Sequence, residues 1–216
     1  MRPSERFGEL LAMEAYRRSL DLARRKAYVC DGEQYNWSVW AEHFQQRGFV
    51  PVLDFVHLLT YVYSAAQAAG GSAKQCWERY ERWLRWAWSG ERAKLLSALT
   101  RASRRAGCPP PGAAESDPRR VLASARTYVI NNIERMDYPR YRKLGLPTSS
   151  APVESEIKQF NRRVKGTEKF WTEEGAEAVL QVRAAYLSQD GRTDRNWALP
   201  RPRYRPVGRN RLALVN

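Results

Sequence analysis

The stretch "AYVCDGEQYNWSVWAEHFQQRGFVPVLDFVHLL", residues 27–59, decides the fold. Residues 27–31 are a short apolar run that ends in an acid, and residues 49–54 repeat this pattern. The segment between them, residues 35–48, reads as a helix that stops at a glycine. A strand, a crossover helix and a second strand are typical of a parallel pair. The expected fold class is therefore α/β.

Helices dominate the rest of the chain. Residues 5–26 have broadly helical apolar spacing, and no further strand pattern follows residue 59. Two segments without periodicity are expected to be a linker, residues 107–118, and a loop rich in proline, residues 136–152. The predicted helices after the second strand cover residues 55–69, 72–89, 91–106, 118–136, 152–166 and about 173–188.

The composition indicates the kind of partner. The chain has 37 Lys and Arg against 23 Asp and Glu, a net charge of +14. Such an excess predicts a polyanionic partner, and nucleic acid is favoured because no long helix pairs a basic face with a lipid-seeking one. The alternative, which gives the charge no binding role, is a soluble basic protein without such a partner. The tail, residues 191–216, is basic and rich in proline, and we expect it to be disordered when unbound.

Compartment follows from what the sequence lacks. No apolar run reaches the roughly 18 residues of a membrane helix, and the charged start does not resemble a signal peptide. The three cysteines are odd in number and have no CxxC spacing. We expect a cytoplasmic, nucleoid-associated protein with no membrane partner.

Three acids occupy positions that metal chemistry could use. Asp31 ends the first predicted strand, Asp54 ends the second, and Glu154 opens a basic helix. The carboxyl ends of parallel strands are where α/β sheets usually bind ligands, and converging carboxylates can hold Mg²⁺. Each acid also has a simpler interpretation, as a turn former or a partner of a helix dipole. His57 lies three residues after Asp54, where it could steady a phosphate or be a half-buried structural histidine.

The segment "CWERYERWLRWAW", residues 76–88, carries an unusual number of aromatic rings. Trp77, Tyr80, Leu84 and Trp88 fall on one helical stripe, which predicts the core-facing side. The remaining tryptophans, Trp83 and Trp86, alternate with Arg79, Arg82 and Arg85, so stacking on nucleic-acid bases is the functional alternative for that side.

Four blocks in this order carry a resemblance: "YVCDGEQYNWSVWAEHF", "VLDFVHLLTYVYSAA", "SSAPVESEIKQFNRRVKG" followed by "EKFW", and "GAEAVLQVRAAYLS". Over roughly residues 10–190 they resemble the carboxyl-terminal half of bacterial insertion-sequence transposases of the DDE class, nearest to the ISKra4-like group. The resemblance implies a partial RNase H-like fold with an all-helical insertion between the second and third catalytic acids. It also implies metal-dependent DNA strand cleavage and transfer, with Mg²⁺ or Mn²⁺ as cofactor.

The resemblance assigns roles residue by residue. Asp31 is similar to the second catalytic aspartate and Glu154 to the final glutamate, so both are expected to be catalytic metal ligands. Asp54 and His57 resemble an acid-x-x-His motif near the active site that helps to hold DNA. Transposon ends and target DNA are the implied partners, and a homo-oligomer is implied by the family. The residues expected to contact DNA are His57, Asn161, Arg162, Arg163, Lys165, Lys169 and Trp171.

The resemblance also implies a division of the chain. Residues 1–54 are expected to form a partial α/β core, residues 55–136 the helical insertion and residues 137–190 the return to the core. Only 30 residues precede Asp31, and they read as a helix rather than as the strands that carry the family's first catalytic aspartate. The expectation is an amino-terminally truncated, catalytically incomplete transposase. Two alternatives stay open: a non-catalytic DNA-binding protein derived from a transposase, and a non-functional remnant.

Overall fold

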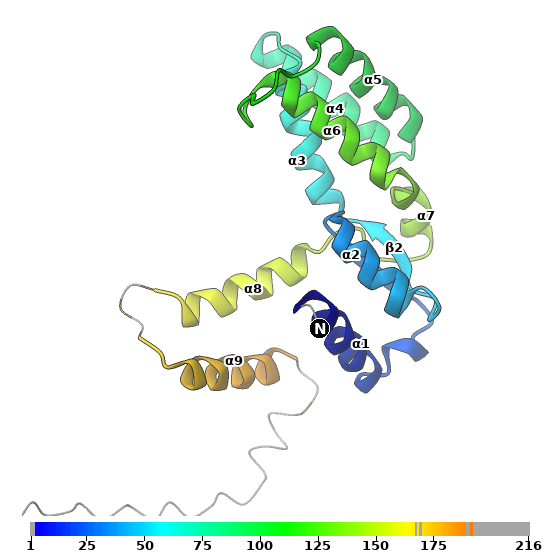
Figure 1. Ribbon diagram of the computed structural model, residues 1–216. Helices are drawn as coiled ribbons and strands as arrows, with labels where there is room; N and C mark the ends of the chain where they lie inside the picture. The colour runs from blue at the N-terminus through cyan, green and yellow to red at the C-terminus, as the bar shows by residue number, and fades with distance from the viewer. Residues whose placement is uncertain (1–2, 167, 169, 189–190, 192–216) are drawn as a thin grey trace, which may run out of the picture. The chain divides into compact units, whose positions relative to one another are not determined.

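The protein is described here by a computed structural model covering residues 3–166, 168, 170–188 and 191 (Figure 1). The chain divides into two compact units, Met1–Val153 and Glu154–Asn216, which are considered separately. Within the described residues, no helix is both long and apolar enough to cross a membrane.

A small sheet confirms the predicted strand–helix–strand unit. Strands β1 (Ala27–Cys30) and β2 (Val50–Leu53) pair in parallel, with Ala27 opposite Val50 and Cys30 opposite Leu53. The crossover is helix α2 (Gln34–Val39), which continues into a π-helical turn. The fold is therefore helix-rich α/β, as expected from the sequence.

The outer edge of β2 is closed by tyrosine hydroxyls. The amide of Val50 donates to Lys26 O and that of Asp54 to Cys30 O, so Pro51 and Leu53 turn their backbone away from β1. Tyr141 Oη donates to Pro51 O at 3.1 Å and Tyr138 Oη to Leu53 O at 3.1 Å. Because proline has no amide hydrogen, little of this edge is left to pair with another strand.

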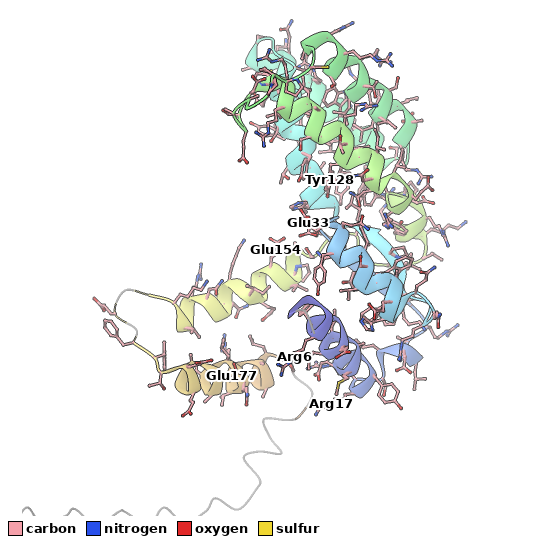
Figure 2. All side chains as sticks on the ribbon, in the orientation of Figure 1. Arg6, Arg17, Glu33, Tyr128, Glu154 and Glu177 are labelled. Carbon is pink, nitrogen blue, oxygen red and sulfur yellow. The ribbon has the colours of Figure 1, made fainter. Side chains whose placement is uncertain are left out.

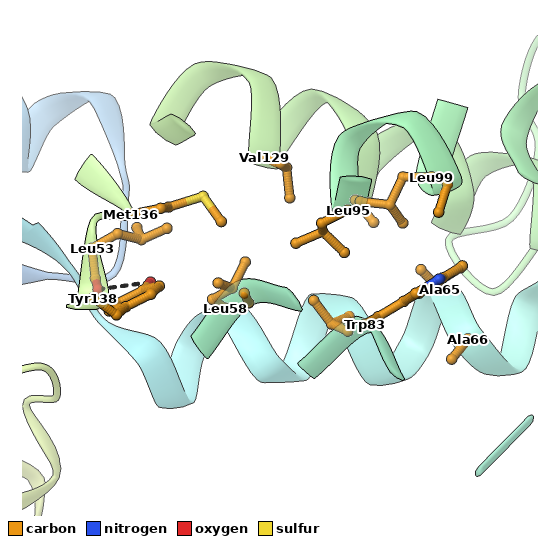
Figure 3. Close-up of a cluster of buried hydrophobic side chains, with 14 of the residues drawn as sticks. Leu53, Leu58, Ala65, Ala66, Trp83, Leu95, Leu99, Val129, Met136 and Tyr138 are labelled. Atoms are coloured by element: carbon orange, nitrogen blue, oxygen red, sulfur yellow. Dashed lines mark hydrogen bonds between the residues drawn. The ribbon is translucent and has the colours of Figure 1, made fainter. Parts of the chain in front are cut away.

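Four helices follow the sheet and enclose most of the core. They are α3 (Phe55–Ala68), α4 (Ala73–Trp88), α5 (Arg92–Ala106) and α6 (Pro118–Asn132). Figure 3 shows Leu58, Trp83, Leu95 and Val129 meeting between them, each at most 4% exposed. Helix α3 starts directly at the end of β2, so this bundle is anchored on the sheet (Figure 1).

The prediction for the core-facing side of α4 was wrong for Trp77 and Trp83, whereas Tyr80 packs against the core as expected. Trp77 is 54% exposed, whereas Trp83 is 4% exposed and is one of the buried residues of α4, with Cys76 and Ala87. Residues 76, 80, 83 and 87 form a helical stripe as good as the one through residue 77, because the helix carries aromatic rings on most sides. Trp83 is therefore a core residue and does not present a ring for base stacking.

The start of the chain is helical over a shorter range than predicted. Helix α1 (Pro3–Arg17) is followed by a 3-10 turn, Leu20–Leu22, instead of continuing to residue 26. Ser19 has a φ of 55°, a left-handed conformation that ends a helix. One side of α1 packs against the apolar cluster of Val39, Phe44 and Phe49.

The predicted loop 136–152 contains an unpredicted helix, α7 (Tyr138–Lys143). The Asp137 side chain accepts from the amide of Arg140 at 3.3 Å, and Pro139 lies in the first turn. Aspartate before a helix and proline in its first turn are both helix-start signals, so the prolines here open a helix rather than a loop.

The second unit contains helix α9 (Glu173–Leu187) and all but the start of α8 (Ala151–Val164), as predicted for both within two residues. Arg183 Nη2 on α9 donates to Gln159 Oε1 on α8 at 3.2 Å. The Thr172 hydroxyl caps α9 by accepting from Gly175 N at 3.1 Å. The predicted disordered tail lies outside the described residues, apart from Gly191.

Candidate functional site at the ends of the two strands

The first unit brings Asp31 and Asp54 to the same end of the sheet. Asp31 directly follows β1 and Asp54 directly follows β2, and their preceding residues, Cys30 and Leu53, are paired. The strand register therefore makes these two aspartates neighbours, in the crevice where open α/β sheets usually bind ligands.

Both carboxylate oxygens of Asp54 accept hydrogen bonds. It is 1% exposed, and its Oδ1 caps α3 by accepting from the amide of His57 at 2.8 Å. Its Oδ2 accepts from both the amide and the hydroxyl of Ser150, each at 2.5 Å. Burial alone raises the pKa of Asp54, but the hydrogen bonds from Ser150 and His57 outweigh it and leave the pKa below its usual value. Asp54 is thus an ionised structural clamp between α3 and the segment before α8.

Hydrogen bonds from the described residues orient Asp31 through only one of its two carboxylate oxygens. It is partly exposed, and its Oδ1 accepts from Asn36 Nδ2 at 2.8 Å and from the amide of Glu33 at 3.1 Å. No described residue donates a hydrogen bond to its Oδ2. One oxygen is fixed by the start of α2 while the other is available to a ligand.

The backbone at Asp31 is held by α6. Tyr128 Oη donates to Asp31 O at 2.6 Å, and the buried Asn132 accepts from Trp37 Nε1 at 2.7 Å. Gly32 has a φ of +93°, and a Cβ there would lie 2.8 Å from Leu53 Cδ1 and 3.0 Å from Tyr128 Cε2. A glycine after Asp31 is therefore required both by the turn and by the close approach of α6.

Aromatic rings line the approach to this end of the sheet. Tyr61 stacks on Tyr128 with ring centroids 3.9 Å apart, and His57 lies 5.7 Å from Tyr61 and 6.0 Å from Tyr128. Two hollows adjoin this group. One of about 510 Å³ lies beside His57 and Arg120, and one of about 490 Å³ is lined by residues that include Glu33 and Tyr128. Figure 2 labels the side chains of Glu33 and Tyr128. The ring of His57 makes no hydrogen bond within the described residues, which leaves it open to a ligand.

The described residues fit one ligand of a divalent cation. Mg²⁺ takes carboxylate oxygens and keeps several waters, so Asp31 Oδ2, oriented by Asn36, has the right chemistry. Asp54 does not fit, because both of its oxygens are engaged. Among the described residues no three His, Cys, Asp or Glu side chains gather as a metal site. Burial raises the pKa of Cys30 to about 12, so this neighbouring thiol is protonated at neutral pH.

The second unit holds the remaining predicted site residues. Glu154 is exposed in the first turn of α8 (Figure 2), and Asn161, Arg162 and Lys165 are exposed near the end of that helix. Trp171 is 45% exposed and donates through Nε1 to Val164 O at 3.0 Å. Arg163 lies within α8, and Lys169 lies outside the described residues.

Sequence reasoning missed the residues that hold the two aspartates. Asn36 lies in the first turn of α2, where a short amide can reach back to a strand-end acid, so this contact had a local signal. Ser150 is separated from Asp54 by 96 positions and Tyr128 from Asp31 by 97, and neither contact leaves a local pattern.

Known proteins add no assignment. No protein family, curated protein or solved structure matches the chain.

Proposed function

We propose that the chain is a DNA-acting protein of the DDE transposase type, built on a partial RNase H-like core. Asp31 and Glu154 are two carboxylates of its metal-dependent strand-transfer site, with Mg²⁺ or Mn²⁺ as the cation. The observation that carries the proposal is the setting of Asp31: it leaves a parallel strand with one carboxylate oxygen fixed and the other accessible. The net charge of +14 supports a nucleic-acid partner.

The proposed roles differ among the residues at this site. Asp31 holds the cation, and Asn36 positions Asp31 by fixing its other oxygen. Asp54 is assigned a structural role beside the site, because both of its carboxylate oxygens already accept hydrogen bonds. His57 faces the hollow beside Tyr61 and Arg120 and would contact a DNA phosphate there. The bound cation would polarise the phosphodiester that is cut.

The metal role of Asp31 is tested without an activity assay. Mn²⁺ added to the ¹⁵N-labelled chain should broaden the amide signals of Asp31, Gly32 and Asn36 selectively, because paramagnetic relaxation falls steeply with distance. Asp31→Asn, which keeps the shape and the hydrogen bond from Asn36, should abolish this broadening. Equal broadening in the wild type and in Asp31→Asn would contradict the assignment.

Catalysis is tested by nicking of supercoiled plasmid with Mg²⁺ or Mn²⁺. We expect no cleavage by the 216-residue chain, since no three carboxylates gather as a metal site among the described residues. Cleavage that disappears in Asp31→Ala and in Glu154→Ala would show that the chain is a complete enzyme.

The second candidate is a DNA-binding protein without catalysis, favoured by the absence of a three-carboxylate cluster among the described residues. The Mn²⁺ experiment separates the two candidates. A chain that binds duplex DNA but shows no selective broadening at Asp31 has a binding function only.

A further inference from the structure

A second hollow lies in the helical bundle, away from the sheet. It has a volume of about 430 Å³ and is bounded by the end of α3, the middle of α4, the end of α5 and the start of α6. Four arginines line it: Arg79 and Arg82 from α4, and Arg101 and Arg105 from α5. Its floor is apolar and includes Trp83 and Leu122, both buried.

In the part of the chain that the structure describes, no acidic side chain lies within ion-pair distance of these four arginines. Arg79 donates to Ala66 O at 2.6 Å and Arg101 to Ser97 Oγ at 2.8 Å, and both bonds fix the guanidinium groups without neutralising them. None of the four forms an ion pair within the described residues, and no carboxylate is among the described residues that line the hollow. Four like charges on one concave surface repel one another, so the site gains from an anion.

On the neighbouring surface of α4, arginines lie next to glutamates that balance their charge. The adjoining hollow is lined by Glu78, Glu81 and Glu91 together with Arg82 and Arg85. Arg85 Nη2 lies 3.6 Å from Glu81 Oε2 and so is already paired. Arg82 lines both hollows, but carboxylates of the described residues line only the adjoining one, so the unbalanced positive charge lies in the hollow with the four arginines.

We propose that this arginine hollow binds the phosphodiester backbone of duplex DNA at a point separate from the strand-end site. Guanidinium groups match phosphate oxygens in geometry, and four of them suit several adjacent phosphates rather than one. The buried apolar side chains beneath the hollow lower the local dielectric constant, which strengthens the attraction between the arginines and an anion. The proposal rests on DNA being the partner, as in the proposed function, and adds a second contact surface on the helical bundle.

The geometry separates this surface from Asp31. Asp54, the neighbour of Asp31, caps the start of helix α3, and the hollow adjoins the other end of this helix at Ala68 and Gly70. A helix of 14 residues is about 21 Å long at 1.5 Å per residue. One duplex spans that distance within about six or seven base pairs, given one charge per roughly 1.7 Å of its axis.

The test measures binding of a fluorescein-labelled 30-base-pair duplex to the full chain in EDTA, at several salt concentrations. The variant is Arg82→Gln/Arg105→Gln, and the matched control is Arg85→Gln/Arg104→Gln, which removes the same charge from the same two helices outside the hollow. We expect the first pair to weaken binding about tenfold and to lower the salt slope by up to about 1.8, at roughly 0.9 per lost phosphate contact. The control should change the affinity less than about twofold. Circular dichroism melts check that both variants fold.

Four other results would overturn the proposal. Equal weakening in the two pairs would mean that only total charge matters. The hollow is a site for small polyphosphates if tripolyphosphate stabilises the wild type but not Arg82→Gln/Arg105→Gln, while both double variants bind the duplex as tightly as the wild type does. If the wild type binds no duplex even at low salt, the proposed function fails as well. Duplex binding that is unchanged by Arg82→Gln/Arg105→Gln rejects the arginine hollow alone.

Discussion

The two strands of the sheet run side by side and each is followed by an aspartate, but the protein surrounds them differently. At β2, the outer carbonyls accept from Tyr138 and Tyr141, and Asp54 accepts three hydrogen bonds. At β1, Asp31 keeps an oxygen without a donor among the described residues. The comparison separates structural from functional acids: the one with every oxygen satisfied supports the fold, and the one left half satisfied is the candidate ligand.

The largest expected effect is on the free energy of unfolding, which we expect Asp54→Ala to lower much more than Asp31→Ala does. Removing Asp54 leaves the donors of Ser150 and His57 unpaired in a buried place, which we expect to cost about 4 kcal/mol. Removing Asp31 breaks two bonds in a partly exposed place and should cost about 1 kcal/mol. Guanidinium denaturation followed by tryptophan fluorescence gives both values. Similar losses would mean that Asp31 is structural too.

The stability of the two variants should also depend differently on pH in the acid range. The pKa of Asp54 is lower in the folded protein than in the unfolded chain, so its ionised form stabilises the fold above the unfolded pKa of about 3.9. That contribution is lost as the pH falls from about 4 through the folded pKa. We expect stability measured between pH 5 and pH 2 to fall less steeply in Asp54→Ala than in Asp31→Ala. Parallel curves would exclude Asp54 as the source.

The tyrosines at the two strands offer a smaller comparison. Tyr138→Phe leaves the buried Leu53 carbonyl without its donor and should cost about 1.5 kcal/mol. Tyr128→Phe removes the bond to Asp31 O, where the side chain is only partly buried and water can replace it, and should cost less than about 1 kcal/mol. Both substitutions keep the ring packing, so chemical denaturation reports the hydroxyls. A larger loss for Tyr128→Phe would reverse the ranking of the strands.

Sequence reasoning succeeded where the pattern is local. The two strands, the crossover and the helices of the bundle follow from apolar periodicity and glycine stops, and Asp31 and Asp54 were expected at strand ends for the same reason. The different roles of the two acids could not be read this way, because Asp54 is engaged by Ser150, far away in sequence. On α4 the choice between the stripes through Trp77 and Trp83 depends on what α3 and α5 present to it, which is tertiary information.

The smallest effect concerns the backbone of the two strands. The ladder pattern turns Val29 away from β2, and no described residue bonds its amide, whereas the amide of Asp54 donates to Cys30 O at 2.8 Å. We expect hydrogen exchange at Val29 to be at least about tenfold faster than at Asp54, a difference of roughly 1.4 kcal/mol in local protection. Exchange followed by NMR at neutral pH measures both amides in one sample, with Val50, which donates to Lys26 O, as a second protected reference. Protection of Val29 equal to that of Asp54 would mean that another segment covers the outer edge of β1, and the contrast between a closed strand and an open one would fail.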